Sequence, residues 1–97
     1  PKPSLPSAVF AFALADFWNR YRDSQNTLSV REIVHGMGSP GRAFRLDEDG
    51  VLSYLDAIAD VTKGVLTFED TSLVRQVVRH GNVKPLHILK GYYRDHE

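Results

Sequence analysis

The histidines are the first residues to consider for chemistry, because imidazole is a common general base and metal ligand. Two ligands share one face of a helix when they stand three or four positions apart. No pair has that spacing among the four histidines, which are His35, His80, His87 and His96. Cysteine is absent, which excludes disulfides and Cys-based zinc sites. We therefore expect no metal site and no cofactor.

Serines and carboxylates are present, but their patterns do not indicate catalysis. No serine stands in a Gly-x-Ser-x-Gly elbow, the turn that exposes a catalytic nucleophile. Asp47 and Asp49 form a carboxylate pair at an expected helix start, where negative charge complements the helix dipole. General acid–base catalysis instead needs partial burial. We predict that the chain is not an enzyme and has no catalytic residues.

Residues 38–46, Gly-Ser-Pro-Gly-Arg-Ala-Phe-Arg-Leu, form the most unusual segment. Its glycines would let backbone amides approach an anion, which Arg42 and Arg45 could neutralise. In the other interpretation, which these residues favour, Phe44 and Leu46 fill the core and both arginines are solvated. In the first interpretation Arg42 and Arg45 are candidate phosphate contacts.

The helix expected over residues 47–62 argues against DNA-groove binding, because DNA-binding helices usually carry base-reading and phosphate-reading side chains. This helix has no Lys or Arg, and its charges are Asp47, Glu48, Asp49, Asp56 and Asp60. Any contact with duplex DNA is therefore expected from cations elsewhere, which are Arg42, Arg45, Arg75, Arg79 and Lys84.

Length and charge limit the classes of function. The 97 residues suffice for one domain, and 12 Lys plus Arg balance 12 Asp plus Glu. A net charge of zero argues against a protein that coats DNA by bulk charge. No apolar run approaches the ~18–20 residues of a membrane span, and no export signal is present. We expect a cytoplasmic protein with no membrane partner.

The N-terminal residues predict a linker followed by a helix. Residues 1–6 contain three prolines and no initiator methionine, so we expect a linker in a fragment of a longer protein. A single domain is then expected over residues 7–97, beginning with a helix over residues 7–22 and Ser7 as its N-cap. The inward stripe of this helix has helical spacing, at Phe10, Leu14, Phe17 and Tyr21. Core packing explains it better than a base-stacking platform, because its neighbours are Ala, Val and Leu.

A second, short helix has two start signals. Ser29 and Glu32 form a capping box, and Leu28 with Ile33 forms a hydrophobic staple. Gly36 is expected to end this helix.

The third helix is predicted to begin after an N-cap at Asp47 and to end before Gly64 at C′. A last helix is predicted to start at Pro85. The residues of this last helix that are expected to face inward are Leu86, Leu89 and Tyr93.

Between these helices the sequence favours a β-hairpin. Residues 65–68 are β-branched and aromatic, and residues 69–72 predict a turn. Residues 73–79 fit either a strand or a helix, and their valines favour the strand.

These elements predict an α+β, mostly helical domain of winged helix-turn-helix type, with three helices, a β-hairpin wing and a C-terminal helix. The predicted core consists of Phe10, Leu14, Phe17, Trp18, Ile33, Leu52, Leu55, Ile58, Phe68 and Leu86.

The string from Ser39 to Glu48 is similar to the signature SPGRxFxLDE of a bacterial family of unknown function. The apolar first helix, Asp70-Thr71, the following Leu–Arg–Gln run and Tyr92-Tyr93 also resemble that family, over most of the chain. Its members are found near genes for PAPS-reductase-like and DNA-phosphorothioation proteins. The resemblance implies a role in DNA modification or defence, and it supplies no catalytic residues.

Two main hypotheses follow for function. One is a non-catalytic, DNA-binding winged-helix module of a DNA sulfur-modification or defence system, which binds duplex DNA weakly. The other is a winged-helix adaptor that docks a DNA-modification enzyme without touching DNA. The acidic third helix favours the adaptor, whereas the basic residues from Arg75 to Lys90 favour DNA. A third, weaker alternative is the regulatory part of an enzyme whose active site lies outside this chain.

Overall fold

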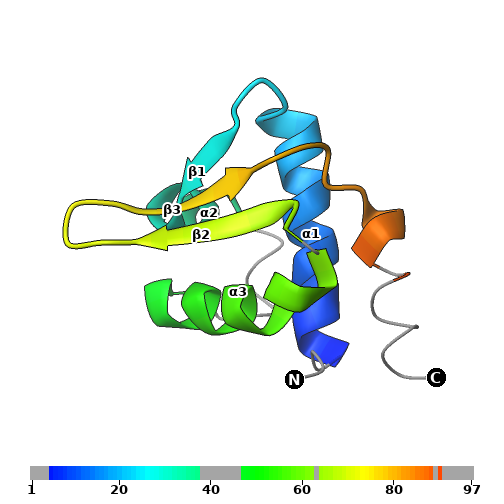
Figure 1. The fold of residues 1–97 in the computed structure, drawn as a ribbon, viewed down its shortest axis with the longest axis horizontal. Helices are drawn as coiled ribbons and strands as arrows, with labels where there is room; N and C mark the ends of the chain where they lie inside the picture. The colour runs from blue at the N-terminus through cyan, green and yellow to red at the C-terminus, as the bar shows by residue number, and fades with distance from the viewer. Residues whose placement is uncertain (1–4, 38–46, 63, 89, 91–97) are drawn as a thin grey trace.

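The computed structural model of the chain describes residues 5–37, 47–62, 64–88 and 90. Its elements are α1 (Leu5–Tyr21), β1 (Thr27–Ser29), α2 (Val30–Gly36), α3 (Glu48–Thr62), β2 (Leu66–Asp70) and β3 (Arg75–Arg79). Residues 85–88 add a short helical turn, which starts at Pro85 as predicted. The domain combines helices with one small sheet, so the predicted α+β, mostly helical class is confirmed (Figure 1).

The three strands form one antiparallel sheet in the order β1-β3-β2. In the central strand β3, Val77 lies opposite Leu28 of β1 on one side and opposite Phe68 of β2 on the other. The predicted hairpin is thus confirmed, and residues 75–79 are strand. Strand β1 was not predicted, because three residues are too few to show alternation. Its pairing partner lies far along the chain.

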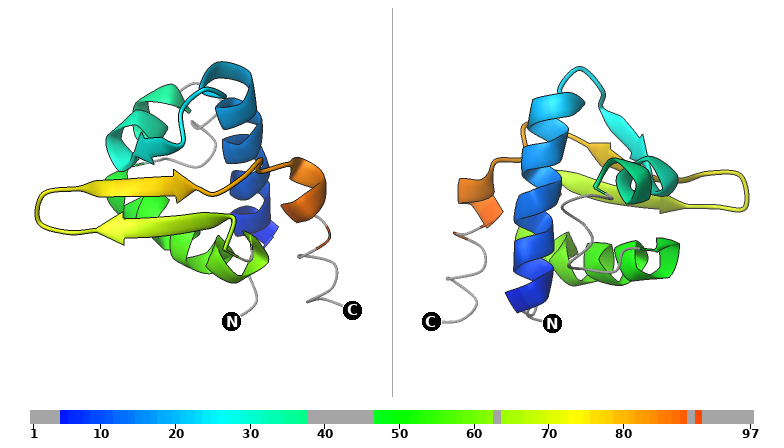
Figure 2. Two further views of the ribbon diagram at one scale, coloured as in Figure 1. Left: turned by 45° about the horizontal axis from the view of Figure 1, so that its top comes forward. Right: turned by 180° about the vertical axis from the view of Figure 1, so that it is seen from behind.

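The hairpin turn lies two residues later than predicted. Strand β2 continues to Asp70, and residues 71–74 connect it to β3. The Thr71 amide donates to the carbonyl of Val74 at 2.7 Å, and the Thr71 hydroxyl accepts from the amides of Leu73 and Val74 at 3.2 and 3.0 Å. These bonds place the turn at Thr71, and the hairpin projects beyond the helices (Figure 2).

Helix α1 begins at Leu5, so the predicted linker is wrong for residues 5 and 6, while residues 1–4 lie outside the described part. Pro6 fits the first helical turn, where its missing amide breaks no bond. Ser7 is buried inside the helix and is not its N-cap. Among the described residues, no helix combines the length and apolar character needed to cross a membrane.

Helix α2 has the predicted start and end. The Ser29 side chain accepts from the Glu32 amide at 3.0 Å, and Leu28 and Ile33 are buried. The helix ends at Gly36, against which the ring of Phe17 packs. A Cβ added at Gly36 would lie 2.2 Å from Phe17 Cζ, so this contact requires glycine.

Helix α3 also has its predicted boundaries. The Asp47 carboxylate accepts from the Gly50 amide at 2.7 Å and caps the N-terminus. Gly64 follows the C-terminus with φ of 81°, a conformation that favours glycine. This helix lies under the hairpin and packs against α1 (Figures 1 and 2).

The core contains most of the predicted residues. Leu52 and Phe68 are half-buried, and the buried ones are Phe10, Leu14, Phe17, Trp18, Ile33, Leu55 and Ile58.

Two residues predicted to face inward are exposed. Tyr21, the last residue of α1, is 63% exposed, and Leu86 is 58% exposed. In the C-terminal turn the buried residue is Ile88, about 200° around a helix from Leu86. The remaining residues of that predicted stripe, Leu89 and Tyr93, lie outside the described residues.

Candidate interaction surface on α3 and the hairpin

The solvent-facing side of α3 is acidic. Asp49, Ser53 and Asp56 are exposed at spacings of four and three residues, which places them on one helical face. Val51 and Leu55 are buried on the other side of the helix. Because α3 contains no Lys or Arg, this face presents negative charge without any cation of its own helix.

Arg75, a predicted DNA contact on the hairpin, is held by two carboxylates. Its Nη1 lies 3.3 Å from Glu48 Oε2 at the start of α3, and its Nε lies 3.1 Å from Asp70 Oδ1 at the end of β2. The side chain is 39% exposed. The guanidinium therefore joins the hairpin to α3, and the three charges together remain negative.

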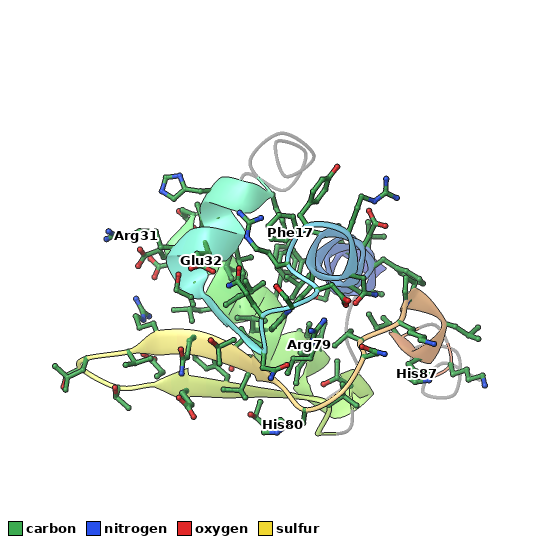
Figure 3. All side chains as sticks on the ribbon, turned by 90° about the horizontal axis from the view of Figure 1, so that it is seen from above. Phe17, Arg31, Glu32, Arg79, His80 and His87 are labelled. Atoms are coloured by element: carbon green, nitrogen blue, oxygen red, sulfur yellow. The ribbon has the colours of Figure 1, made fainter. Side chains whose placement is uncertain are left out.

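Arg79, the second predicted contact on this strand, is buried. Its side chain is 5% exposed, donates to the Asp23 carbonyl and lies 3.6 Å from Asp23 Oδ1 (Figure 3). The prediction that Arg79 is presented to phosphate is therefore wrong. Strand alternation gives the reason, since Arg79 shares the inward face of β3 with buried Val77.

The other predicted cations do not complete a patch. Lys84 is exposed beyond the end of β3, and Arg42 and Arg45 lie outside the described residues. Of the five predicted contacts, the structure describes three and does not join them in one exposed surface.

The hairpin also carries exposed apolar groups, and sequence analysis did not predict the exposure of Leu73. Leu73 in the hairpin turn is 92% exposed, beside the exposed Val74. A hollow of about 270 Å³ lies between α3 and the hairpin, lined mainly by Leu55, Ile58, Leu66, Phe68 and Val77. No periodic pattern could reveal Leu73, because its exposure follows from the position of the turn. We call the acidic stripe of α3 (Asp49, Ser53 and Asp56), residues 69–70 and Leu73 the α3–hairpin surface. The hollow lies on the other side of α3 from this stripe.

The histidines are spread over separate parts of the fold. His35, His80 and His87 are exposed on α2, after β3 and on the C-terminal turn, and His96 lies outside the described part (Figure 3). His80 Nε2 lies 2.8 Å from the Thr67 hydroxyl. Within the described ranges, no three His, Cys, Asp or Glu side chains come together as a metal site.

Comparison with known proteins shows the family of this chain. No curated protein and no solved structure matches it. A family model matches residues 1–93, which is nearly the whole chain. The chain therefore belongs to the family described as "Protein of unknown function (DUF4007)".

Proposed function

We propose that this domain is a non-catalytic, winged-helix-like adaptor that docks a basic protein partner on its α3–hairpin surface. The element order α1-β1-α2-α3-β2-β3, with a projecting two-stranded hairpin, supports the winged-helix likeness (Figure 2). Because such folds serve many functions, the surface chemistry carries the functional argument.

The observation that carries the proposal is the charge of α3. In a DNA-reading helix, exposed side chains donate to phosphates and base edges. Here that position holds Asp49 and Asp56, and the nearest hairpin cation, Arg75, is neutralised by Glu48 and Asp70. This surface would repel DNA and attract a basic protein surface.

The apolar groups define the partner further. Leu73, which is almost fully exposed in the hairpin turn, offers an apolar anchor for a partner. We therefore propose a partner surface that presents Lys or Arg to α3 and an apolar side chain to Leu73. The resemblance to a family found near phosphorothioation genes favours an enzyme of DNA sulfur modification.

The test measures binding between the whole chain and the PAPS-reductase-like protein that the resemblance implies as a neighbour. The double variant Asp49→Lys, Asp56→Lys should lower the affinity at least tenfold, because it places like charges across the interface. Glu32→Lys on α2 reverses one charge away from this surface and should leave binding unchanged, whereas each of the single variants Asp49→Lys and Asp56→Lys should weaken it. The proposal would be contradicted if the Asp49→Lys, Asp56→Lys variant and the Glu32→Lys variant bound the partner protein with equal affinity.

The second candidate is a module that binds duplex DNA through the hairpin and the segment after it. The winged-helix-like element order and the exposed Lys84 favour it. Submicromolar binding of a duplex at physiological salt, lost in a Lys84→Ala, Arg75→Ala variant, would select this function over the adaptor.

A further inference from the structure

We propose that the face where the C-terminal end of α1 meets α2 binds single-stranded nucleic acid. Two hollows of about 480 and 510 Å³ lie on this face. Both are lined by Arg22 and Gly36, so they form one continuous surface, which we call the α1–α2 groove. Figure 3 views the molecule from this side, with Phe17 between the two helices.

Cations are distributed along the whole groove. Arg20 lines the half beside α1, Arg31 lines the half on α2, and Arg22 lines both. Arg31 is exposed, and no ion pair joins it to another described residue. Cations spaced along a groove match a polymer with one negative charge per unit better than they match a single phosphate.

Of the two carboxylates that line the groove, Asp16 is neutralised by an arginine, whereas Glu32 accepts a hydrogen bond from a neutral amide and keeps its charge. Asp16 lies 3.1 Å from Arg20 within α1, and Glu32 Oε2 accepts from Gln25 Nε2 at 3.5 Å. Arg22 and Arg31 have no carboxylate partner among the described residues. Arg22 Nη1 donates to the Tyr21 carbonyl at 2.8 Å, so the remaining N–H groups of Arg22 and the guanidinium of Arg31 are the donors available to phosphate.

Flat π-surfaces lie beside these cations. Tyr21 is exposed, and its ring lies 6.0 Å from that of Phe17 at a tilt of 40°. The Arg22 guanidinium lies over the Phe17 ring at 5.6 Å. Aromatic rings and guanidinium planes are the groups on which unpaired bases stack.

This combination distinguishes a nucleic-acid strand from an acidic peptide. Both ligands would satisfy the arginines, but nucleobases also stack on an exposed tyrosine beside a guanidinium, whereas carboxylate side chains have no π-face to stack. Duplex DNA keeps its bases stacked inside, so it cannot use Tyr21 in this way. The groove lies on α1 and α2, away from the α3–hairpin surface, so this proposal stands independently of the adaptor function.

The experiment titrates the whole chain into a fluorescein-labelled ten-nucleotide oligo(dT) at several salt concentrations and follows the anisotropy. Tyr21→Ala should weaken binding roughly tenfold, the size of one lost stacking contact. Arg31→Ala should reduce the salt slope by about 0.7, the value for one phosphate contact on a single strand. Lys84→Ala, an exposed cation outside the groove, is the matched control and should change neither quantity.

Two competitors separate the alternatives. An abasic strand of equal length keeps the phosphates and lacks the bases, so it should compete at least tenfold less well than oligo(dT). Ten-residue poly-Glu should also compete weakly. Equal competition by either polyanion, or binding unaffected by both Tyr21→Ala and Arg31→Ala, would overturn the proposal. Undetectable binding of oligo(dT) at low salt would overturn it as well.

Discussion

The guanidinium of Arg79 lies over the indole ring of Trp18, 5.2 Å from its centre, on the inner side of the sheet. The contact joins the end of β3 to α1. The loop after α1 is held at the same place, because the Arg79 side chain donates to the Asp23 carbonyl and Trp18 Nε1 donates to the Gln25 carbonyl at 2.8 Å. The Arg79 amide also donates to the Asn26 carbonyl at 2.7 Å. A cation predicted to bind DNA is therefore part of the core.

Replacing Arg79 by Ala should lower the free energy of unfolding by about 2–4 kcal/mol, since the change removes a desolvated cation–π contact and a charge-assisted hydrogen bond. Arg79→Lys should lower the free energy of unfolding by a smaller amount, because lysine keeps the positive charge. It should still cost stability, because lysine lacks the planar guanidinium. Urea denaturation measures both. The matched control is Arg31→Ala, an exposed arginine whose loss should stay within about 0.5 kcal/mol. Equal stability of the Arg79→Ala and Arg31→Ala variants would contradict the buried position.

Gly36→Ala should destabilise the protein although alanine is the better helix former. The added Cβ would meet the Phe17 ring at 2.2 Å, and overpacking of this kind costs about 1–3 kcal/mol. The gain in helix propensity is at most about 1 kcal/mol, so a net loss is expected. Gly81→Ala is the control, because a Cβ there meets nothing within 4 Å. Thermal melts in which Gly36→Ala equals or exceeds the parent would disprove this close approach.

Leu55 and Leu73 give a matched pair of leucine truncations. Leu55 is buried between α3 and the sheet, so Leu55→Ala should cost about 2–5 kcal/mol. Leu73 is almost fully exposed, so Leu73→Ala should leave stability unchanged within about 0.5 kcal/mol. Denaturant melts decide this prediction. A loss at Leu73 as large as that at Leu55 would show that the hairpin turn is packed against the domain.

Duplex DNA should bind weakly, with a dissociation constant at or beyond about 10⁻⁴ M at physiological salt. The net charge is zero and the exposed side of α3 is acidic. Of the predicted contacts that the structure describes, Arg75 and Lys84 should contribute to whatever binding occurs, and their joint replacement by Ala should flatten the salt slope by about two units. Arg79 is left unchanged in this variant, because replacing its buried side chain would test the stability of the fold and not DNA binding. A titration in which the double variant keeps the parent slope would exclude both side chains from the interface.

The helix boundaries were largely determined by the sequence alone, because capping is local chemistry. Ser29 bonds the amide three residues on, Asp47 does the same for Gly50, and Gly64 adopts a positive φ. Each of these interactions is complete within one turn of chain, so its residues and spacing are visible in the sequence. The buried stripes of α1 and α3 were predictable for the same reason, since helical periodicity assigns one face to the core.

The positions of the functional side chains were decided only by the tertiary structure. Strand β1 forms because β3 pairs with it. Arg79 is buried because the face of β3 that carries Val77 and Arg79 is turned toward Trp18. Tyr21 and Leu73 are exposed because the chain around them leaves the core at a helix end and a turn. Such outcomes depend on segments that meet across the fold, and an amphipathic side chain such as arginine or tyrosine is compatible with either burial or exposure until that packing is set.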